Sequence, residues 1–389
     1  MNRSWLVGIA AACMIVAMDL PARAQRSGGD VIKTRSAGRV KGNVETITRN
    51  EVVISQDGIS KTLQADDVER IVFLGEPDKM QLAWTAADKG DYANALKDID
   101  KLKPDDLDRD LLRTELAYMK LVFAVKLAIT GETDSDDDQS SDTTPADLTR
   151  SNSVDVTKEN PVDLAKEVGP QLIEFLKQNS NSFHFYEGNE LVGDLLVWLG
   201  NVEQKPAYFA SASTYYAELA KSPWPEFRAR ADLLRARQLQ LQGKYDESLA
   251  AYDAVLRVNA SGEFAESQLQ EAAIGRTYCL VGTNKAREAL KILQDTIAKA
   301  DDDDTVLLAR AYCALGNCYR ALNDNQQALW AYLRVDLEYP SAPESHAEAL
   351  ANLEVLWSAA HRPDRARDAH DYLLAHYPFS RWSKRSQAH

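Results

Sequence analysis

The sequence predicts a mainly α-helical protein in which an α-solenoid of helical hairpins follows a small β meander or barrel. Three observations predict this fold class. Polar and apolar residues alternate through residues 30–76, helical periodicity runs through residues 79–381, and one pattern recurs along the helical part. Of the 389 residues, 45% are hydrophobic and 27% are charged, so the chain has the composition of a globular protein with enough apolar residues for a core.

The first 24 residues are expected to be a signal peptide. Arg3 precedes the apolar run LVGIAAACMIVAM, which is too short to span a bilayer comfortably, and the small residues Ala22 and Ala24 precede Gln25. This order predicts cleavage after Ala24 and a periplasmic or otherwise exported product. Cys13 follows three alanines, as loosely seen in lipoproteins, so lipidation at Cys13 is the alternative, although the apolar run continues past it.

Residues 30–76 are predicted to form four or five short strands. Val52, Val53 and Ile54 are β-branched, and Gly42 and the pair Asp57-Gly58 mark turns. The pattern GRVKGNV, followed by VVISQDG and DDVERIVF, resembles Sm-like and SH3-like small barrels. The resemblance implies a docking module. A stabilising N-terminal appendage is the alternative.

Residues 131–160 interrupt the helical part and are predicted to be a disordered acidic insertion. The stretch is rich in Asp, Ser and Thr and almost free of large apolar residues, so it cannot bury enough surface to offset the entropy of ordering. Calcium binding is disfavoured because the stretch lacks the glycine and terminal glutamate of an EF-hand loop.

The recurring pattern is clearest in ARAYCALGNCYRALNDNQQALWAYLRVDLEYP, residues 309–340. Small residues at Gly316 and Ala328 allow two antiparallel helices to approach closely. Tyr319 and Tyr332 fill the space between hairpins, and Pro340 ends the second helix because it cannot continue one. The pattern therefore predicts a pair of packed helices that needs neighbouring pairs to cover its apolar faces.

Other copies predict about six such hairpins in all. They carry the same order of small, aromatic and helix-ending residues: Ala236, Gly243, Tyr245, Ser248 and Tyr252; Gly275, Tyr278, Gly282 and Ala289; Leu353, Trp357, Ala366, His370 and Pro378; and Gly90, Tyr92 and Ala95. Over roughly residues 79–381 the chain resembles the tetratricopeptide-repeat (TPR) superfamily. The similarity to TPR proteins of the bacterial envelope is loose, because the β part and the acidic insertion depart from them.

The resemblance implies a superhelix whose concave groove is lined by the first helix of each hairpin and binds a protein or peptide. Carried onto this chain, the groove positions form a mostly basic row, Arg230, Arg237, Arg276, Arg310, Asn317 and Arg320. A basic row in a chain of formal net charge −14 favours acidic or C-terminal peptides as ligands. The alternative is that these arginines pair with neighbouring acids such as Glu271 or Asp232.

The same features argue against other functions. The net charge of −14 disfavours nucleic-acid binding. Known catalytic motifs and metal-ligand spacings are absent from the sequence, so we expect no enzyme activity, no cofactor and no metal. Cys279, Cys313 and Cys318 are interpreted as buried small residues, and the C-terminal histidines as packing or surface residues. The second functional hypothesis is a structural subunit of an envelope complex that assembles through its β part. A membrane is expected only by association or through lipidation.

Overall fold

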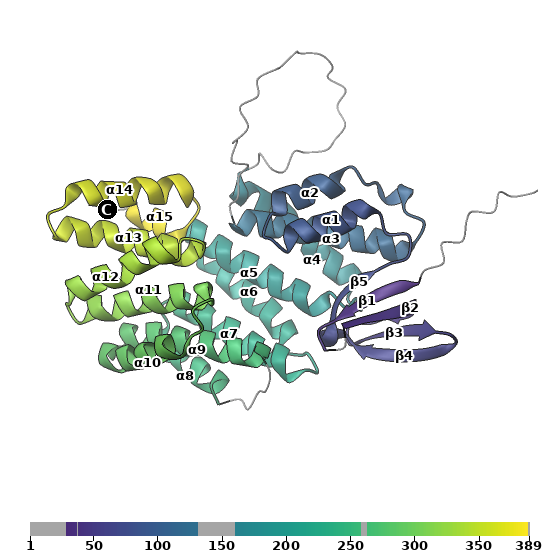
Figure 1. Ribbon diagram of the computed structural model, residues 1–389, viewed down its shortest axis with the longest axis horizontal. Helices are drawn as coiled ribbons and strands as arrows, with labels where there is room; N and C mark the ends of the chain where they lie inside the picture. Colours follow the sequence, from purple (N-terminus) through teal and green to yellow (C-terminus); the bar gives the residue numbers. More distant parts are fainter. Residues whose placement is uncertain (1–28, 37, 131–159, 258–262, 388–389) are drawn as a thin grey trace, which may run out of the picture.

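The computed structural model describes residues 29–36, 38–130, 160–257 and 263–387. A five-stranded antiparallel sheet is followed, within these ranges, by fifteen α-helices (Figure 1). This confirms the predicted fold class. The predicted signal peptide and residues 131–159 of the predicted acidic insertion lie outside the described residues.

The sheet is a meander whose last strand returns to the first. Its strands are β1 (Asp30–Thr34), β2 (Gly38–Ile47), β3 (Glu51–Gln56), β4 (Ile59–Gln64) and β5 (Val68–Val72), in the order β4-β3-β2-β1-β5. A short 3₁₀ turn, Ala65–Asp67, precedes β5. Asp57 and Gly58 both have positive φ in the β3–β4 turn, as the sequence predicted for this pair.

The apolar face of the sheet is continuous with the core of the first helices. Ile32 and Ile54 are fully buried in one cluster with Met80 of α1. At the edge of this cluster Asp30 accepts hydrogen bonds from the backbone N–H groups of Val44 (2.8 Å) and Leu74 (2.7 Å) and from Arg109. The sheet is therefore held to the helices both by a shared core and by a buried carboxylate.

The helices pair into seven antiparallel hairpins and one terminal helix. They are α1 (Asp78–Ala87), α2 (Tyr92–Asp100), α3 (Asp110–Thr130), α4 (Pro161–Gln178), α5 (Phe185–Glu203), α6 (Pro206–Leu219), α7 (Pro225–Leu241), α8 (Tyr245–Val255), α9 (Glu263–Gly282), α10 (Ala286–Lys299), α11 (Thr305–Ala321), α12 (Asn325–Glu338), α13 (Pro343–Ala359), α14 (Pro363–His376) and α15 (Arg381–Ser386). The expected number was about six.

Glycines of several first helices lie directly against tyrosine rings. A Cβ at Gly316 would lie 2.5 Å from the ring of Tyr332 in the same hairpin, and one at Gly193 would lie 2.3 Å from the ring of Tyr216. Tyr332 is fully buried. The small residue allows the close approach that the sequence pattern predicted, but the tyrosine it meets lies within the same hairpin rather than in the space between hairpins, where Tyr332 was expected.

The first helices form an inner layer, and the chain folds back onto it. Each of α3, α5, α7, α9 and α11 contacts the next first helix along the chain, up to α13. The terminal helix α15 packs on α13 and α14 and also contacts α5, four hairpins earlier (Figure 1). In the described part of the chain, no helix has the length and hydropathy to cross a membrane.

Candidate functional site on the inner helices

All six predicted site residues lie on first helices, as expected. Arg230 and Arg237 are on α7, Arg276 is on α9, and Arg310, Asn317 and Arg320 are on α11. They do not form one uniform row of available cations, because their partners differ. The contacts of each residue decide what it can still bind.

Arg230 and Arg310 belong to an ionic ladder that crosses four first helices. Arg230 Nε lies 2.8 Å from Glu190 Oε1 on α5, and its Nη1 lies 3.0 Å from Glu271 Oε2 on α9. The other oxygen of Glu271 lies 3.2 Å from Arg310 Nη1 on α11. Burial tends to raise the pKa of Glu271, but Arg310, Arg230 and Arg237 outweigh it and hold the pKa below its usual range. The ladder therefore ties α5, α7, α9 and α11 together.

Asn317 and Arg320 connect α11 to α13. Asn317 donates to Glu348 Oε1 at 2.6 Å, and its side-chain oxygen accepts from the Tyr332 hydroxyl at 2.9 Å. Arg320 donates to the side-chain oxygen of Asn352. Glu348 is 3% exposed, and burial raises its pKa despite the influence of Arg381 and Asn317. Two side chains that were predicted to bind the ligand therefore connect α11 to α13.

Arg276 is engaged by acids of the second helices. Its Nε lies 2.7 Å from Asp253 Oδ1 on α8, and its Nη2 lies 3.2 Å from Glu288 Oε1 on α10. The alternative of pairing with neighbouring acids thus describes Arg230, Arg276 and Arg310. Glu271 is one of the acids involved, whereas Asp232, the other acid considered, is exposed to solvent.

Arg237 is different from the other five. Within the described residues it makes no hydrogen bond and no ion pair within 4.0 Å. The carboxylates of Glu271, Asp194 and Glu344 act on it from further away. Burial lowers the pKa of Arg237, and these three carboxylates more than compensate, so the pKa is raised. Its guanidinium group is therefore charged, and within the described residues it is the one in the predicted set that has neither an ion pair nor a hydrogen bond.

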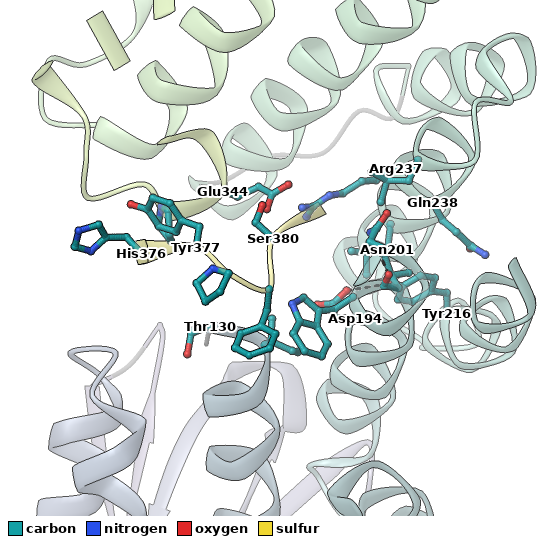
Figure 2. A pocket seen from close by; sticks show the side chains of 18 residues that line it. Thr130, Asp194, Asn201, Tyr216, Arg237, Gln238, Glu344, His376, Tyr377 and Ser380 are labelled. Carbon is teal, nitrogen blue, oxygen red and sulfur yellow. Dashed lines mark hydrogen bonds between the residues drawn. The ribbon is translucent and has the colours of Figure 1, made fainter. Parts of the chain in front are cut away.

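Arg237 lines a cavity of about 310 Å³ between the inner helices and the C-terminal segment. Figure 2 shows Arg237 reaching from α7 toward Glu344 and Ser380. Trp198 of α5 and Phe379, which follows α14, also line the cavity. The walls thus combine charged groups with aromatic rings, and they come from α3, from α5 to α7, and from the C-terminal end of the chain.

Asp194 is a second polar group of this cavity. Its Oδ1 accepts a hydrogen bond from the Tyr216 hydroxyl at 2.8 Å (Figure 2). Burial, and then the nearby charge of Glu190, raise the pKa of Asp194 to about 6, against the lowering influence of Tyr216, Arg237 and Arg230. Sequence reasoning missed this residue, because nothing local marks Asp194 as different from other helix carboxylates.

The C-terminal wall is fixed by polar contacts. The Tyr377 hydroxyl lies 2.8 Å from His346 Nδ1, and Arg381 Nε lies 3.1 Å from Glu344 Oε1. Ser386 donates to Glu354 Oε2 at 2.6 Å. Two of the C-terminal histidines are thus used in packing: His346 bonds Tyr377, and His370 bonds Glu354.

The described residues offer few other chemically active groups. No three His, Cys, Asp or Glu side chains of that part gather as a metal site requires. Cys279, Cys313 and Cys318 are buried free thiols, which agrees with their interpretation as small buried residues. The cavity beside Arg237 is therefore the site to which the observations lead.

No protein-family model matches the sequence, and no curated protein matches it. Solved structures do match. A tetratricopeptide repeat protein from Parabacteroides merdae is 15% identical, with 80% of this chain and 98% of that chain covered at a TM-score of 0.49. A Rap protein complexed with competence and sporulation factor is 13% identical, with coverages of 79% and 77% and a TM-score of 0.46. YrrB, a TPR protein with an unusual peptide-binding site, is 15% identical, with coverages of 57% and 100% and a TM-score of 0.29.

The fold class rests on the molecule itself. In the described part of the chain, seven helical hairpins stack in order, their first helices form the inner layer, and glycines of first helices pack on tyrosine rings. The chain is a TPR-like α-solenoid with a five-stranded antiparallel sheet at its N-terminal end.

Proposed function

We propose that the protein is a non-enzymatic, protein-binding scaffold that takes an acidic or C-terminal peptide of its partner on the inner layer. The observation that carries the proposal is Arg237, a partly buried cation that lines a cavity without an ion pair of its own in the described part of the chain. A peptide carboxylate there gains a charge-assisted hydrogen bond, which is worth about 1.5–3 kcal/mol.

The other five residues of the predicted set act in this proposal by shaping the site. Arg230 and Arg310 hold α7 and α11 to the shared carboxylate of Glu271, and Asn317 and Arg320 hold α11 to α13. Arg276 braces α9 against α8 and α10. A receptor built in this way presents its free cation on a stiff wall, so less ordering entropy is lost when a peptide binds.

The test is partner capture followed by a measured affinity. Cross-linked capture with the full chain identifies the protein retained by the wild type, and its binding is then titrated against three variants. Arg237→Gln is expected to weaken binding roughly ten- to a hundredfold. Arg276→Gln is expected to weaken it less, and Arg334→Gln, an exposed site on α12, not at all. Equal affinities for the wild type and Arg237→Gln would refute the proposal.

The edge strand β4 favours one alternative, a structural subunit that assembles through its sheet. Among the residues that the structure describes, β4 pairs only with β3, and Ile59 at its start is 75% exposed. An edge strand with free backbone groups can accept a strand of another chain. In that case Thr62→Pro on β4 abolishes capture of the partner, whereas Arg237→Gln leaves it intact.

We further propose export, on the sequence order of Arg3, the apolar run and the small residues Ala22 and Ala24. Intact mass of native protein is expected to show a chain that begins at Gln25. A mass showing lipid on Cys13 would replace this with the lipoprotein alternative.

A further inference from the structure

We propose that the cavity beside Arg237 holds one large apolar side chain of the partner peptide, adjacent to the carboxylate that Arg237 binds. The inference rests on the proposed peptide-binding function and specifies it. It assigns the partner a two-part recognition element, an aromatic or large aliphatic residue together with an acidic group. It also assigns half of the receptor site to the chain's own C-terminal segment.

The size and lining of the cavity support the apolar part of the proposed recognition element. Its volume of about 310 Å³ is at the lower end of the range of ligand pockets, roughly 300–1,000 Å³, and suits one side chain rather than a folded domain. Ile129, Trp198, Leu234 and Phe379 supply apolar wall. In Figure 2 the polar groups of Arg237, Glu344 and Ser380 lie close together. A ligand with one acidic and one apolar group fits a lining that offers both kinds of side chain.

The charges around Arg237 support the acidic part of the proposed recognition element. Of the three carboxylates that act on Arg237, Glu271 is already paired with Arg230 and Arg310, and Glu344 is paired with Arg381. Asp194 is the third, and it can be protonated near neutral pH. A ligand carboxylate can therefore replace the charge of Asp194 beside Arg237 if Asp194 takes up a proton.

The C-terminal segment makes the site composite. His376 to Ser380 form one side of the cavity, opposite α5 and α7, and α15 contacts α5 just beyond them. The bonds of Tyr377 to His346 and of Arg381 to Glu344 fix this segment. Phe379 therefore both contacts the ligand side chain and helps to position it. It forms part of the cavity wall only while α15 is packed against α5.

The experiment uses the full chain and three synthetic peptides that are acetylated at the N-terminus and labelled for fluorescence anisotropy. The first ends in Gly-Ser-Phe with a free carboxylate, the second replaces Phe by Ala, and the third keeps Phe but carries a C-terminal amide. The wild type is expected to bind the first peptide at least about tenfold more tightly than either of the others, since an aromatic side chain that loses most of its exposure contributes about 1.5–3 kcal/mol.

Two variants and a matched control locate the contact. Trp198→Ala and Phe379→Ala are each expected to remove the preference for Phe over Ala. Trp330→Ala, which truncates a tryptophan that is 61% exposed on α12, is expected to keep it. Circular dichroism and the thermal midpoint establish that each variant is folded. Because Phe379 lies in the terminal segment and Trp198 in the middle of α5, one of the two remains informative if the other destabilises the fold.

The affinity for the first peptide is also expected to rise as the pH is lowered from about 7.5 to about 5.5, because Asp194 must take up a proton. The charged and titratable groups that act on Asp194 are Glu190 on its own helix, Tyr216 on α6, and Arg230 and Arg237 on α7, while Glu344 and His376 line the same cavity. Burial raises the pKa of Tyr216, and burial at Arg237 is outweighed by nearby carboxylates, which raise its pKa, so neither group loses its proton in this range. Asp194→Asn is expected to flatten the dependence.

The outcomes separate this inference from the function on which it rests. Equal affinity for the Phe and Ala peptides, with loss of both in Arg237→Gln, would overturn the apolar half and leave the acidic-peptide scaffold standing. No binding of the Phe peptide to the wild type at millimolar concentration would overturn the inference, while the capture experiment still decides the scaffold. A Phe preference that survives both Trp198→Ala and Phe379→Ala would place the apolar contact elsewhere and overturn it as well.

Discussion

Arg230 Nη1 lies 3.0 Å from Glu271 Oε2, a contact between residues 41 positions apart that joins the first helices α7 and α9. The second oxygen of the same carboxylate faces Arg310 of α11. One glutamate thus bridges two arginines, one on either side of it, and the side chain of Glu271 is only 21% exposed. Cations that sequence analysis assigns to a ligand are here part of the framework.

Glu271→Gln is expected to lower the free energy of unfolding by about 2–3 kcal/mol, because it leaves two partly buried guanidinium groups with weakened partners. Urea unfolding followed by circular dichroism measures the change. Glu338→Gln is the matched control. It breaks the ion pair between Glu338 and Arg334, whose two side chains are each about half exposed. The expected loss in the free energy of unfolding is therefore below about 1 kcal/mol. Equal effects of the two changes would contradict the framework role.

Gly316→Ala is expected to destabilise the protein by about 1–3 kcal/mol. A Cβ there lies 2.5 Å from the ring of Tyr332, which is fully buried and hydrogen-bonded through its hydroxyl to Asn317, so the ring cannot move aside. Gly282→Ala makes a similarly close contact, 2.4 Å, with Tyr245, but that ring is 36% exposed and can swing into solvent. The comparison of the two thermal midpoints tests whether the closeness of the contact or the mobility of the ring sets the cost.

Asp194→Asn is expected to raise the free energy of unfolding at pH 7.5 by about 1–3 kcal/mol. The pKa of Asp194 is raised from its usual 3.8 to about 6, so between these values the folded protein holds a proton that the unfolded chain has lost. Stability that depends on this proton is present at low pH and is lost as the pH rises through about 6. Urea titrations at pH 5 and pH 7.5 measure the difference, with Asp295→Asn, exposed on α10, as the control. A wild-type-like pH dependence in Asp194→Asn would disprove this account.

Asp30→Asn is expected to cost about 2–4 kcal/mol at neutral pH, because the buried carboxylate serves Arg109 and two backbone N–H groups. Burial tends to raise the pKa of Asp30, but the bonds from Arg109, Leu74 and Val44 outweigh it and lower the pKa. This contribution is therefore present above about pH 4 and is lost as the pH falls through the lowered pKa. The difference between wild type and variant in acid unfolding should shrink below that pH. Asp57→Asn in the exposed β3–β4 turn, where Asn tolerates the positive φ, is the control and should change little.

Local spacing explains which parts of the fold could be predicted. Gly316 and Tyr332 are 16 residues apart in one hairpin, so the short pattern that recurs along the sequence contains both residues of the contact. The strands were predictable for the same reason, since alternation and turn residues are local signals. The helix α5 was not predicted as a first helix, because no copy of the sequence pattern was recognised in it.

The candidate site depends on longer-range geometry that spacing does not contain. Arg230 and Arg237 are two turns apart on α7, so a sequence pattern treats them alike. They differ because Glu190 of α5 faces Arg230, whereas Asp194, one turn further along α5, is bonded to Tyr216. The contact between α15 and α5 is harder still to predict, since it results from small rotations accumulated over several hairpins.

That contact between α15 and α5 changes how the molecule is expected to come apart. An open row of repeats has two free ends, and each terminal unit has one neighbour, so such a row unravels progressively from its ends. Here the last helix is also anchored to the third hairpin, which gives the C-terminal end a second neighbour. To detach, the final hairpin must lose two interfaces at once. We therefore expect hairpins α5 to α14 to melt as one cooperative unit, with amide exchange at the C-terminal end as slow as in the middle of the array.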